Sequence, residues 1–389
     1  MKKHLFFLSV MLMGAALFTA CDDDDEVKAP TPHPVNVSNG VFVVCSGNYY
    51  KSIDGSLSYY DYTTKTCTNA AFAAANGRVL GMTANDAVVY GNKLYIAVTN
   101  ENTIEVVDKN TLLSVRQLKM TDLIEGSKGE LPRHLAAANG KVYVTTYGES
   151  ASDYSTGTTS GQGYVAVIDT ASFAIDNVFA VGTYPEGIAI IGNFAYVLNS
   201  DYSYGNASIS QVNLTTGEDT KLTDSNILNP VEIAAIDGVL YYLDSGTYGP
   251  APTYAQENAG IRKVEEGGVV TRVADATAMS VSANKLYLIN APYGSTTTSY
   301  AIYDPATSLS TAITFDEEPF QPRAINADPV SGDIFVASPT KDPESGYANN
   351  GLPGTVNIYN ATGSKQGSFT CGVGPQAIVF NTGVQYVLQ

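Results

Sequence analysis

The sequence has 389 residues, enough for one large repeat array or for two or three domains. Acidic residues outnumber basic ones 38 to 21, and the net charge of −17 argues against a nucleic-acid partner, because phosphate binding needs clustered Lys and Arg. A hydrophobic content of 44% excludes wholesale disorder. Of the three histidines, only His134 falls in the part predicted to fold, which argues against a paired-histidine metal site.

The first 20 residues have the pattern of a secretory signal. A basic start precedes an apolar run, Leu5–Phe18, which is too short to span a membrane and is followed by small residues. The segment Leu17–Cys21 (LFTAC) resembles a bacterial lipobox, in which the cysteine is lipidated and begins the mature protein. The alternative is an ordinary signal followed by a chance cysteine. We expect residues 1–20 to be removed and a lipid on Cys21 to anchor the protein to a membrane without spanning it.

An acidic run and a proline-rich tether follow the cysteine. The five acids of Asp22–Glu26 repel one another and must stay solvated, so they form at least a soluble spacer. The run also resembles the acidic tag by which some Gram-negative lipoproteins reach the outer face of the outer membrane. Lys28–Pro34 (KAPTPHP) is expected to be an extended tether. We therefore assign residues 21–39 to the lipidated cysteine, tag and tether, and residues 40–389 to one domain.

A pattern recurs along this domain: a proline, two variable residues, an apolar pair, a turn and an aromatic strand. It is seen in Pro132–Val144, Pro185–Val197 and Pro230–Tyr242. The strand aromatics recur 45 to 53 residues apart, and they are Phe42, Tyr95, Tyr143, Tyr196, Tyr241, Tyr287, Phe335 and Tyr386. This period is typical of a four-stranded propeller blade and is too long for most helical repeats.

The strand pattern also predicts how the domain closes. Period-2 alternation without helical periodicity predicts an all-β fold. Seven units begin between Phe42 and Phe335, and the tail from Gly374 repeats the first half of a unit that the N-terminus lacks. We predict a seven-bladed β-propeller with four-stranded blades, closed by the C-terminal strand, with an eighth blade as the alternative. Val384–Leu388 and Val41–Cys45 both fit the second strand of the closing blade, and the sequence leaves this open.

Three cysteines lie in the predicted domain, namely Cys45, Cys67 and Cys371. A secreted setting permits disulfides, but an odd number of thiols allows at most one pair within the chain. Cys45 and Cys67 would lie on non-adjacent strands of one blade. We therefore favour buried free thiols, although the sequence does not fix the disulfide state.

Long, glycine-rich connections join the second strand of each unit to the third, and ten of the 26 tyrosines fall in them. In a propeller these connections rim the central channel, on the same face as those that lead from the fourth strand to the next blade. Tyrosine offers a large apolar ring and a hydrogen-bonding tip, although any one ring could instead pack on a neighbouring blade. The predicted ligand-binding tyrosines are Tyr49, Tyr50, Tyr147, Tyr154, Tyr202, Tyr204, Tyr248, Tyr254, Tyr293 and Tyr347.

A polar position recurs at the entry of the first strands and should circle the channel mouth. Arg133 and Arg323 are candidates to hold an anionic group, and the alternative is that each pairs with a nearby acid such as Glu186. The predicted polar ligand-binding residues are Asn85, Arg133, Glu186, Arg323 and Gln376.

Motifs of catalysis are missing from the sequence. It contains no nucleophile elbow, phosphate loop or zinc signature. An enzyme would need an acid–base cluster in the channel, for which the sequence offers only Asp86, His134, Glu186 and Glu232. We therefore predict a binding protein without catalytic residues, metal or catalytic cofactor.

The combination of signal, lipobox, acidic tag and propeller blades resembles the cobalamin-capturing surface lipoproteins of gut bacteria, and more broadly the quinoprotein-like and periplasmic propellers. The likeness covers Cys21–Gln389, but its motifs belong to propellers in general. The resemblance implies a surface-exposed, outer-membrane lipoprotein that binds cobalamin (vitamin B12) and passes it to a TonB-dependent transporter. It assigns no residue of the site.

The chemistry of cobalamin suits such a face. Cobalamin is a broad, mostly neutral disc edged with amides and carrying one phosphate, so Tyr, Asn, Ser and main-chain groups could meet the amides and an Arg the phosphate. Capture of a surface glycan is the nearest alternative, and the absence of Trp counts against it. A scaffold between surface proteins, or a lactonase or lyase, remains a further alternative.

Overall fold

The computed structural model describes residues 32–153, 158–200 and 206–388, so the predicted signal and lipidation site lie outside it. One compact unit spans Asn36–Val384, and the described ends, 32–35 and 385–388, belong to a second, small unit. Within the described residues, seven sheets have four strands and three have two. The fold is all-β, and four-stranded antiparallel sheets in this number are typical of propellers.

Six of the four-stranded sheets take their strands in chain order, each strand pairing antiparallel with the next. The first two of these sheets contain β4 (Ala84–Tyr90), β5 (Lys93–Val98), β6 (Thr103–Asp108) and β7 (Ser114–Lys119), and then β8 (Pro132–Ala138), β9 (Lys141–Thr146), β12 (Gly163–Asp169) and β13 (Ile175–Val181). The next two contain β14 (Pro185–Ile191), β15 (Phe194–Asn199), β16 (Ser208–Asn213) and β17 (Asp219–Leu222), and then β18 (Pro230–Ile236), β19 (Val239–Asp244), β22 (Gly260–Val264) and β23 (Val270–Ala274). The last two contain β24 (Ala278–Ser282), β25 (Lys285–Asn290), β26 (Ser299–Asp304) and β27 (Leu309–Ile313), and then β28 (Ala324–Ala327), β29 (Ile334–Ser338), β32 (Pro353–Tyr359) and β33 (Lys365–Val373).

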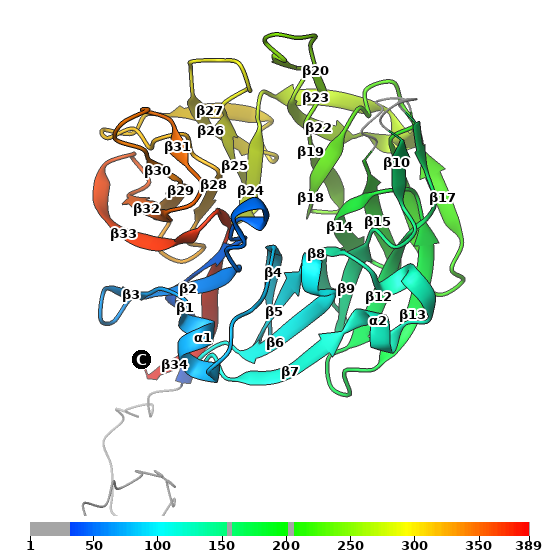
Figure 1. Cartoon of the computed structure of the whole chain (residues 1–389), viewed down its shortest axis with the longest axis horizontal. Helices are drawn as coiled ribbons and strands as arrows, with labels where there is room; N and C mark the ends of the chain where they lie inside the picture. Colours follow the sequence, from blue (N-terminus) through cyan, green and yellow to red (C-terminus); the bar gives the residue numbers. More distant parts are fainter. Residues whose placement is uncertain (1–31, 154–157, 201–205, 389) are drawn as a thin grey trace, which may run out of the picture. The chain divides into compact units, whose positions relative to one another are not determined.

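The seventh sheet combines both ends of the described chain. Its order is β34 (Pro375–Leu388), β1 (Pro32–Cys45), β2 (Ser56–Asp61) and β3 (Thr66–Thr68). Figure 1 shows β34 in red beside β1 in blue. Val41–Cys45 therefore occupies the second position, and Val384–Leu388 is the end of the first strand. Because β1 pairs with this long tail, it begins at Pro32, before the predicted domain boundary at residue 40 and inside the predicted tether.

The three two-stranded sheets share one location. Each is a hairpin inside a connection between the second and third strands of a four-stranded sheet, where we expected only long loops. They are β10 (Ala151–Asp153) with β11 (Thr158–Ser160), β20 (Thr247–Tyr248) with β21 (Gln256–Glu257), and β30 (Thr340–Lys341) with β31 (Ala348–Asn349). The sequence did not reveal these hairpins, because each strand is only two or three residues long.

Helices are few and short. They are α1 (Ala71–Asn76), α2 (Met120–Leu123) and the 3-10 turns Tyr49–Lys51, Thr99–Glu101, Gly126–Gly129 and Glu266–Gly268. None of the helices in the described part of the chain has the length and apolar character needed to cross a membrane.

Tight turns join the first and second strands. Asn139 and Gly140, between β8 and β9, both have positive φ, as do Asp237 and Gly238 between β18 and β19. Two successive residues with positive φ suit the right-handed twist of a two-residue hairpin, and Asn, Asp and Gly adopt this conformation at low cost.

The core lies between neighbouring sheets. Of the predicted strand aromatics, Phe42, Tyr95 and Tyr143 are buried, as are Tyr241, Tyr287 and Phe335, and Tyr196 is half-buried. Tyr386 is 70% exposed, so including it in the series was wrong. It lies near the end of β34, which takes the first position in its sheet, whereas the buried aromatics lie on second strands.

The cysteines differ in burial. Cys45 and Cys371 are buried, Cys67 is half-buried, and all three are free thiols. The expectation of buried free thiols therefore holds for two of them. Cys67 lies on β3, the outermost strand of its sheet, which explains its partial exposure.

Candidate functional site

Exposed aromatic side chains concentrate in the connections between second and third strands. Among the large exposed side chains of the described residues are seven tyrosines, and six of them lie in these connections. They are Tyr49, Tyr50, Tyr248, Tyr254, Tyr293 and Tyr347, all among the predicted ligand-binding residues. The seventh is Tyr386 on β34. We call the first six the loop tyrosines.

Neighbouring connections hold one another in place. The ring centroids of Tyr248 and Tyr293, which belong to adjacent sheets, are 6.4 Å apart. The main-chain N–H of Gln256 donates to the oxygen of Tyr293 at 2.9 Å, and Nδ2 of Asn48 donates to the oxygen of Asn350 at 2.8 Å. The loop tyrosines are therefore displayed by connections with hydrogen-bonded backbones.

The four remaining predicted tyrosines lie either outside the described residues or in a partly buried position. Tyr154, Tyr202 and Tyr204 lie outside the described residues. Tyr147 is half-buried, with its ring 4.9 Å from that of Tyr184 and edge-on to it. Its hydroxyl donates to Glu186, and its role as a ligand contact stays a prediction.

A cavity of about 640 Å³, called the channel below, is lined by the first strands β4, β8, β14, β18, β24, β28 and β34. Polar residues at its wall include Asp86, His134, Glu232 and Arg323. First strands of successive sheets also contact each other, for example β4 with β8 and β14 with β18. The channel is thus formed by residues from strands far apart in the sequence.

An ion network lies where β4, β8 and β14 meet. Nε and Nη2 of Arg133 donate to the two carboxylate oxygens of Glu186 at 3.0 and 3.2 Å. The imidazole of His134 lies between two acids, with Nδ1 3.4 Å from Oδ2 of Asp86 and Nε2 3.3 Å from Oε2 of Glu186. Tyr147 completes the network through its hydroxyl and through its ring, whose centroid is 4.9 Å from the Arg133 guanidinium carbon. Arg133 therefore pairs with an acid, which is the alternative raised above.

The network fixes the charge of its members. Burial favours a neutral imidazole, but the hydrogen bonds and charges of Asp86 and Glu186 raise the pKa of His134 to about 9. Burial also favours a neutral Glu186, but Arg133, His134 and Tyr147 lower the pKa of this carboxyl to about 2. Both ring nitrogens of His134 face carboxylates, so neither remains to accept a proton from a substrate.

Glu232 differs from the other acids of the channel. Asp86 accepts the main-chain N–H groups of Ala87 and Leu135 and faces His134, whereas Glu232 accepts the N–H of Met279. No ion pair of Glu232 is found within the described ranges. Burial raises the pKa of Glu232 to about 7, although His134 and the Met279 N–H oppose this shift.

The remaining predicted polar residues also lie at the channel. Nδ2 of Asn85 donates to the oxygen of Arg133 at 2.9 Å, so this buried amide joins β4 to β8 at the wall of the channel. Arg323 and Gln376 are exposed and line the channel. In the part of the chain that the structure describes, the Arg323 guanidinium has no ion-pair partner.

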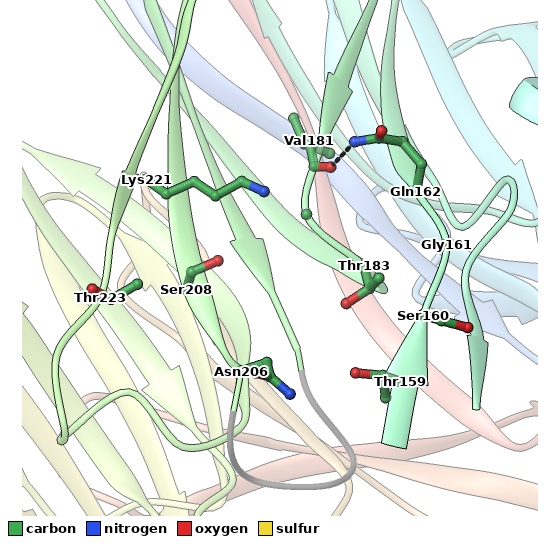
Figure 2. A pocket seen from close by; sticks show the side chains of 11 residues that line it. Thr159, Ser160, Gly161, Gln162, Val181, Thr183, Asn206, Ser208, Lys221 and Thr223 are labelled. Carbon is green, nitrogen blue, oxygen red and sulfur yellow. Dashed lines mark hydrogen bonds between the residues drawn. The ribbon is translucent and has the colours of Figure 1, made fainter. Parts of the chain in front are cut away.

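A second cavity, of about 400 Å³, lies between the sheet of β12 and β13 and the sheet of β16 and β17. Figure 2 shows hydroxyl and amide side chains around it, with Lys221 extending across it toward Val181 and Gln162. Lys221 is the one charged side chain among the described residues that line this cavity. The cavity was not predicted, because its lining comes from short polar segments of two sheets. Thr159, Gln162 and Asn206 belong to the same class of connection as the loop tyrosines.

The described residues contain no group of three or more His, Cys, Asp or Glu side chains arranged to hold a metal ion. The arrangement instead offers rings and amides at the loops, one lysine in a polar cavity, and a charged wall in the channel. These features define an all-β protein with propeller-type sheets and a tyrosine-bearing loop region.

Comparison with solved structures agrees with this fold. A candidate 6-phosphogluconolactonase from Bacteroides uniformis matches with a TM-score of 0.54 and 11% identity, covering 88% of this chain and 100% of that one. A hypothetical selenium-binding protein from Sulfolobus tokodaii matches with a TM-score of 0.53 and 10% identity over 93% and 94% of the two chains. A Synechocystis apocarotenoid oxygenase variant has a TM-score of 0.52 and 9% identity over 92% and 97%. At such identities the likeness concerns the fold alone.

The sequence places the chain in a family. Residues 39–371 match the domain of unknown function DUF5074, and the protein belongs to this family. A search of the curated proteins finds no match.

Proposed function

We propose that this protein is a surface lipoprotein whose propeller captures cobalamin on the loop tyrosines and passes it to a TonB-dependent outer-membrane transporter. One observation carries the binding part of the proposal. Six of the seven exposed tyrosines found in the described residues lie in one class of connection, although these connections are a small part of the chain. Exposed aromatic side chains concentrated in this way mark a binding surface, because leaving them in water is unfavourable without a partner.

A closed ring of seven blades would put these connections on one face. Contacts between first strands support such closure. Nδ2 of Asn326 on β28 donates to the oxygen of Ile378 on β34 at 2.8 Å, and Nδ2 of Asn381 on β34 donates to the oxygen of Lys109, which follows β6, at 3.2 Å. The C-terminal strand thus contacts both the last and the first of the six sheets formed in chain order, as a closing strand should.

The chemistry of the loop region suits a broad ligand rich in amides. Tyrosine rings provide flat apolar contact, and their hydroxyls, with neighbouring main-chain groups, provide donors and acceptors. Lys221 lies in a cavity lined by hydroxyl and amide groups and can meet the single phosphate of cobalamin, the role first considered for Arg133. A binding role also agrees with the ion network, in which His134 has no free ring nitrogen.

The test is calorimetric titration of the protein with cyanocobalamin. We expect one-to-one binding with a Kd of about 1 nM or lower, since a large flat ligand buries much surface. Tyr248→Ala and Tyr293→Ala should each cost about 1–3 kcal/mol of binding free energy where the ring is an anchor. Lys221→Gln should weaken cyanocobalamin and leave an analogue without the phosphate unaffected.

Tyr386→Ala is the matched control, because this tyrosine is as exposed as the loop tyrosines but lies on β34. Its removal should leave the affinity unchanged. Oligosaccharides test the glycan alternative under the same conditions. Heat with an oligosaccharide and none with micromolar cyanocobalamin would replace the vitamin by a glycan as the ligand.

A further inference from the structure

The channel carries two charged side chains, Glu232 and Arg323, that have no ion-pair partner in the described residues. On the side formed by β4, β8, β14 and β18, three acids (Asp86, Glu186 and Glu232) face two cations, Arg133 and His134. Asp86 and Glu186 take part in the ion network, and both cations are engaged there. Glu232 is the acid left over, and when it is ionised this side has a net charge of −1.

The same cavity is also lined by a positively charged side chain. Arg323 precedes β28 and lines the same cavity. Its side chain is exposed, and it has no ion-pair partner within residues 32–153, 158–200 and 206–388. One unpaired carboxyl and one unpaired guanidinium therefore line a single cavity of about 640 Å³. Glu232 is partly buried, so its ionised carboxylate is disfavoured without a partner, whereas the exposed guanidinium of Arg323 is accessible to a ligand.

Small residues leave room beside Glu232. Gly187 occupies the position between His134 on β8 and Glu232 on β18. A Cβ atom at residue 187 would lie 2.9 Å from the nitrogen of Ile233 and 3.1 Å from Cα of Glu232, so glycine is needed there. Ala278 and Ala324 line the wall further round. Glycine at position 187 thus lets β14 approach the main chain of β18 closely, and each alanine adds only a methyl group to the channel wall.

We propose that the channel is a second binding site, for a small zwitterion whose ammonium group meets Glu232 and whose carboxylate meets Arg323. Carboxylate–ammonium and guanidinium–carboxylate pairs are the charge-assisted hydrogen bonds that such groups form. The site is separate from the loop tyrosines and does not rest on the function proposed for them.

The protonation of Glu232 provides a second signature. Its carboxyl is influenced by His134 on β8, Asp86 on β4 and Glu186 on β14, and it accepts the Met279 N–H on β24. Because the pKa of Glu232 is raised to about 7, the free site loses its negative charge below neutral pH. Binding of an ammonium group should therefore weaken as the pH falls from 8 to 6.

The experiment is calorimetric titration of the protein with probes of graded length, since the span between the two charges sets the best fit. Glycine, 4-aminobutyrate and 6-aminohexanoate are compared with butylamine and butyrate, which carry one charge each. We expect at least one amino acid to bind about tenfold more tightly than either singly charged probe. Glu232→Gln and Arg323→Gln should each weaken it about tenfold.

Two exposed residues outside the channel, Glu218 on the turn before β17 and Arg116 on β7, serve as matched controls. Glu218→Gln and Arg116→Gln should leave probe binding unchanged. The inference is overturned if no amino acid exceeds the singly charged probes, or if its affinity survives Glu232→Gln. Titration of Glu232→Gln with cyanocobalamin separates the two sites, because this substitution should not alter a ligand held by the loop tyrosines.

Discussion

Nε2 of His134 lies 3.3 Å from Oε2 of Glu186, on a neighbouring first strand, and the same carboxylate is held by Arg133. The pair joins β8 to β14 inside the fold and keeps Glu186 ionised although it is buried. Burying ions costs free energy, and the cost is offset here because each charge has several partners. Substitutions in this network should therefore show its cooperativity.

Arg133→Ala should destabilise the protein by about 3 kcal/mol, because it leaves Glu186 buried with fewer partners. Adding Glu186→Gln should recover part of the loss, since the unbalanced charge is then removed. Urea unfolding of the two variants and the wild type measures both effects. Equal stability of Arg133→Ala and the wild type would show that the pair contributes nothing.

Stability should fall as the pH rises from 7 to 9. The pKa of His134 is about 9 in the folded protein and about 6.5 in an unfolded chain, so its contribution is complete below 6.5 and is lost as the pH rises through 9. We expect a loss on the order of 2–3 kcal/mol. The raised pKa of Glu232 also lowers the stability of the fold as the pH rises. Most of that loss occurs between the unfolded pKa of about 4.5 and the folded pKa of about 7, which is below this window.

His134→Gln is the variant that checks this assignment. It should be less stable than the wild type at pH 6.5, and its melting temperature should change little between pH 7 and 9. A wild-type slope that persists in His134→Gln would assign the pH dependence to another group.

Ile378→Ala should cost about 2–4 kcal/mol of stability, because this side chain of β34 is buried against β28 and β29. The matched control is Val384→Ala on the same strand, whose side chain is 58% exposed. It should change the melting temperature very little. Similar effects of the two substitutions in thermal melting would argue that β34 is held by its backbone alone and not by the packing of its side chains.

Surface display depends on residues outside the described part of the chain. If Cys21 is lipidated and the acidic run acts as a tag, protease added to intact cells should degrade the protein. Cys21→Ala should release it in soluble form. Changing Asp22–Glu26 to alanines should leave it membrane-bound and shielded from protease. Wild-type protein that resists protease on intact cells would contradict surface display.

The sequence alone indicated the all-β fold and the loop tyrosines, because both follow from local patterns. Alternating apolar residues and turns such as Asn139–Gly140 specify strands and hairpins wherever they occur. The recurrence of Tyr248, Tyr254 and Tyr293 in long connections, where loops meet solvent, was enough to predict their exposure.

Only the tertiary structure decided which polar residues meet. The sequence left pairing of Arg133 with Glu186 as one of two alternatives, and the structure decided between them, because the two residues lie on different sheets whose first strands pack together. The same is true of Val41–Cys45, which takes the second place in its sheet because β34 pairs along its edge. Glu232 has the same position in its repeat as His134, yet it lacks an ion-pair partner in the described residues. Its different environment arises because Gly187 and the Met279 N–H, not an arginine, are its neighbours across the strands.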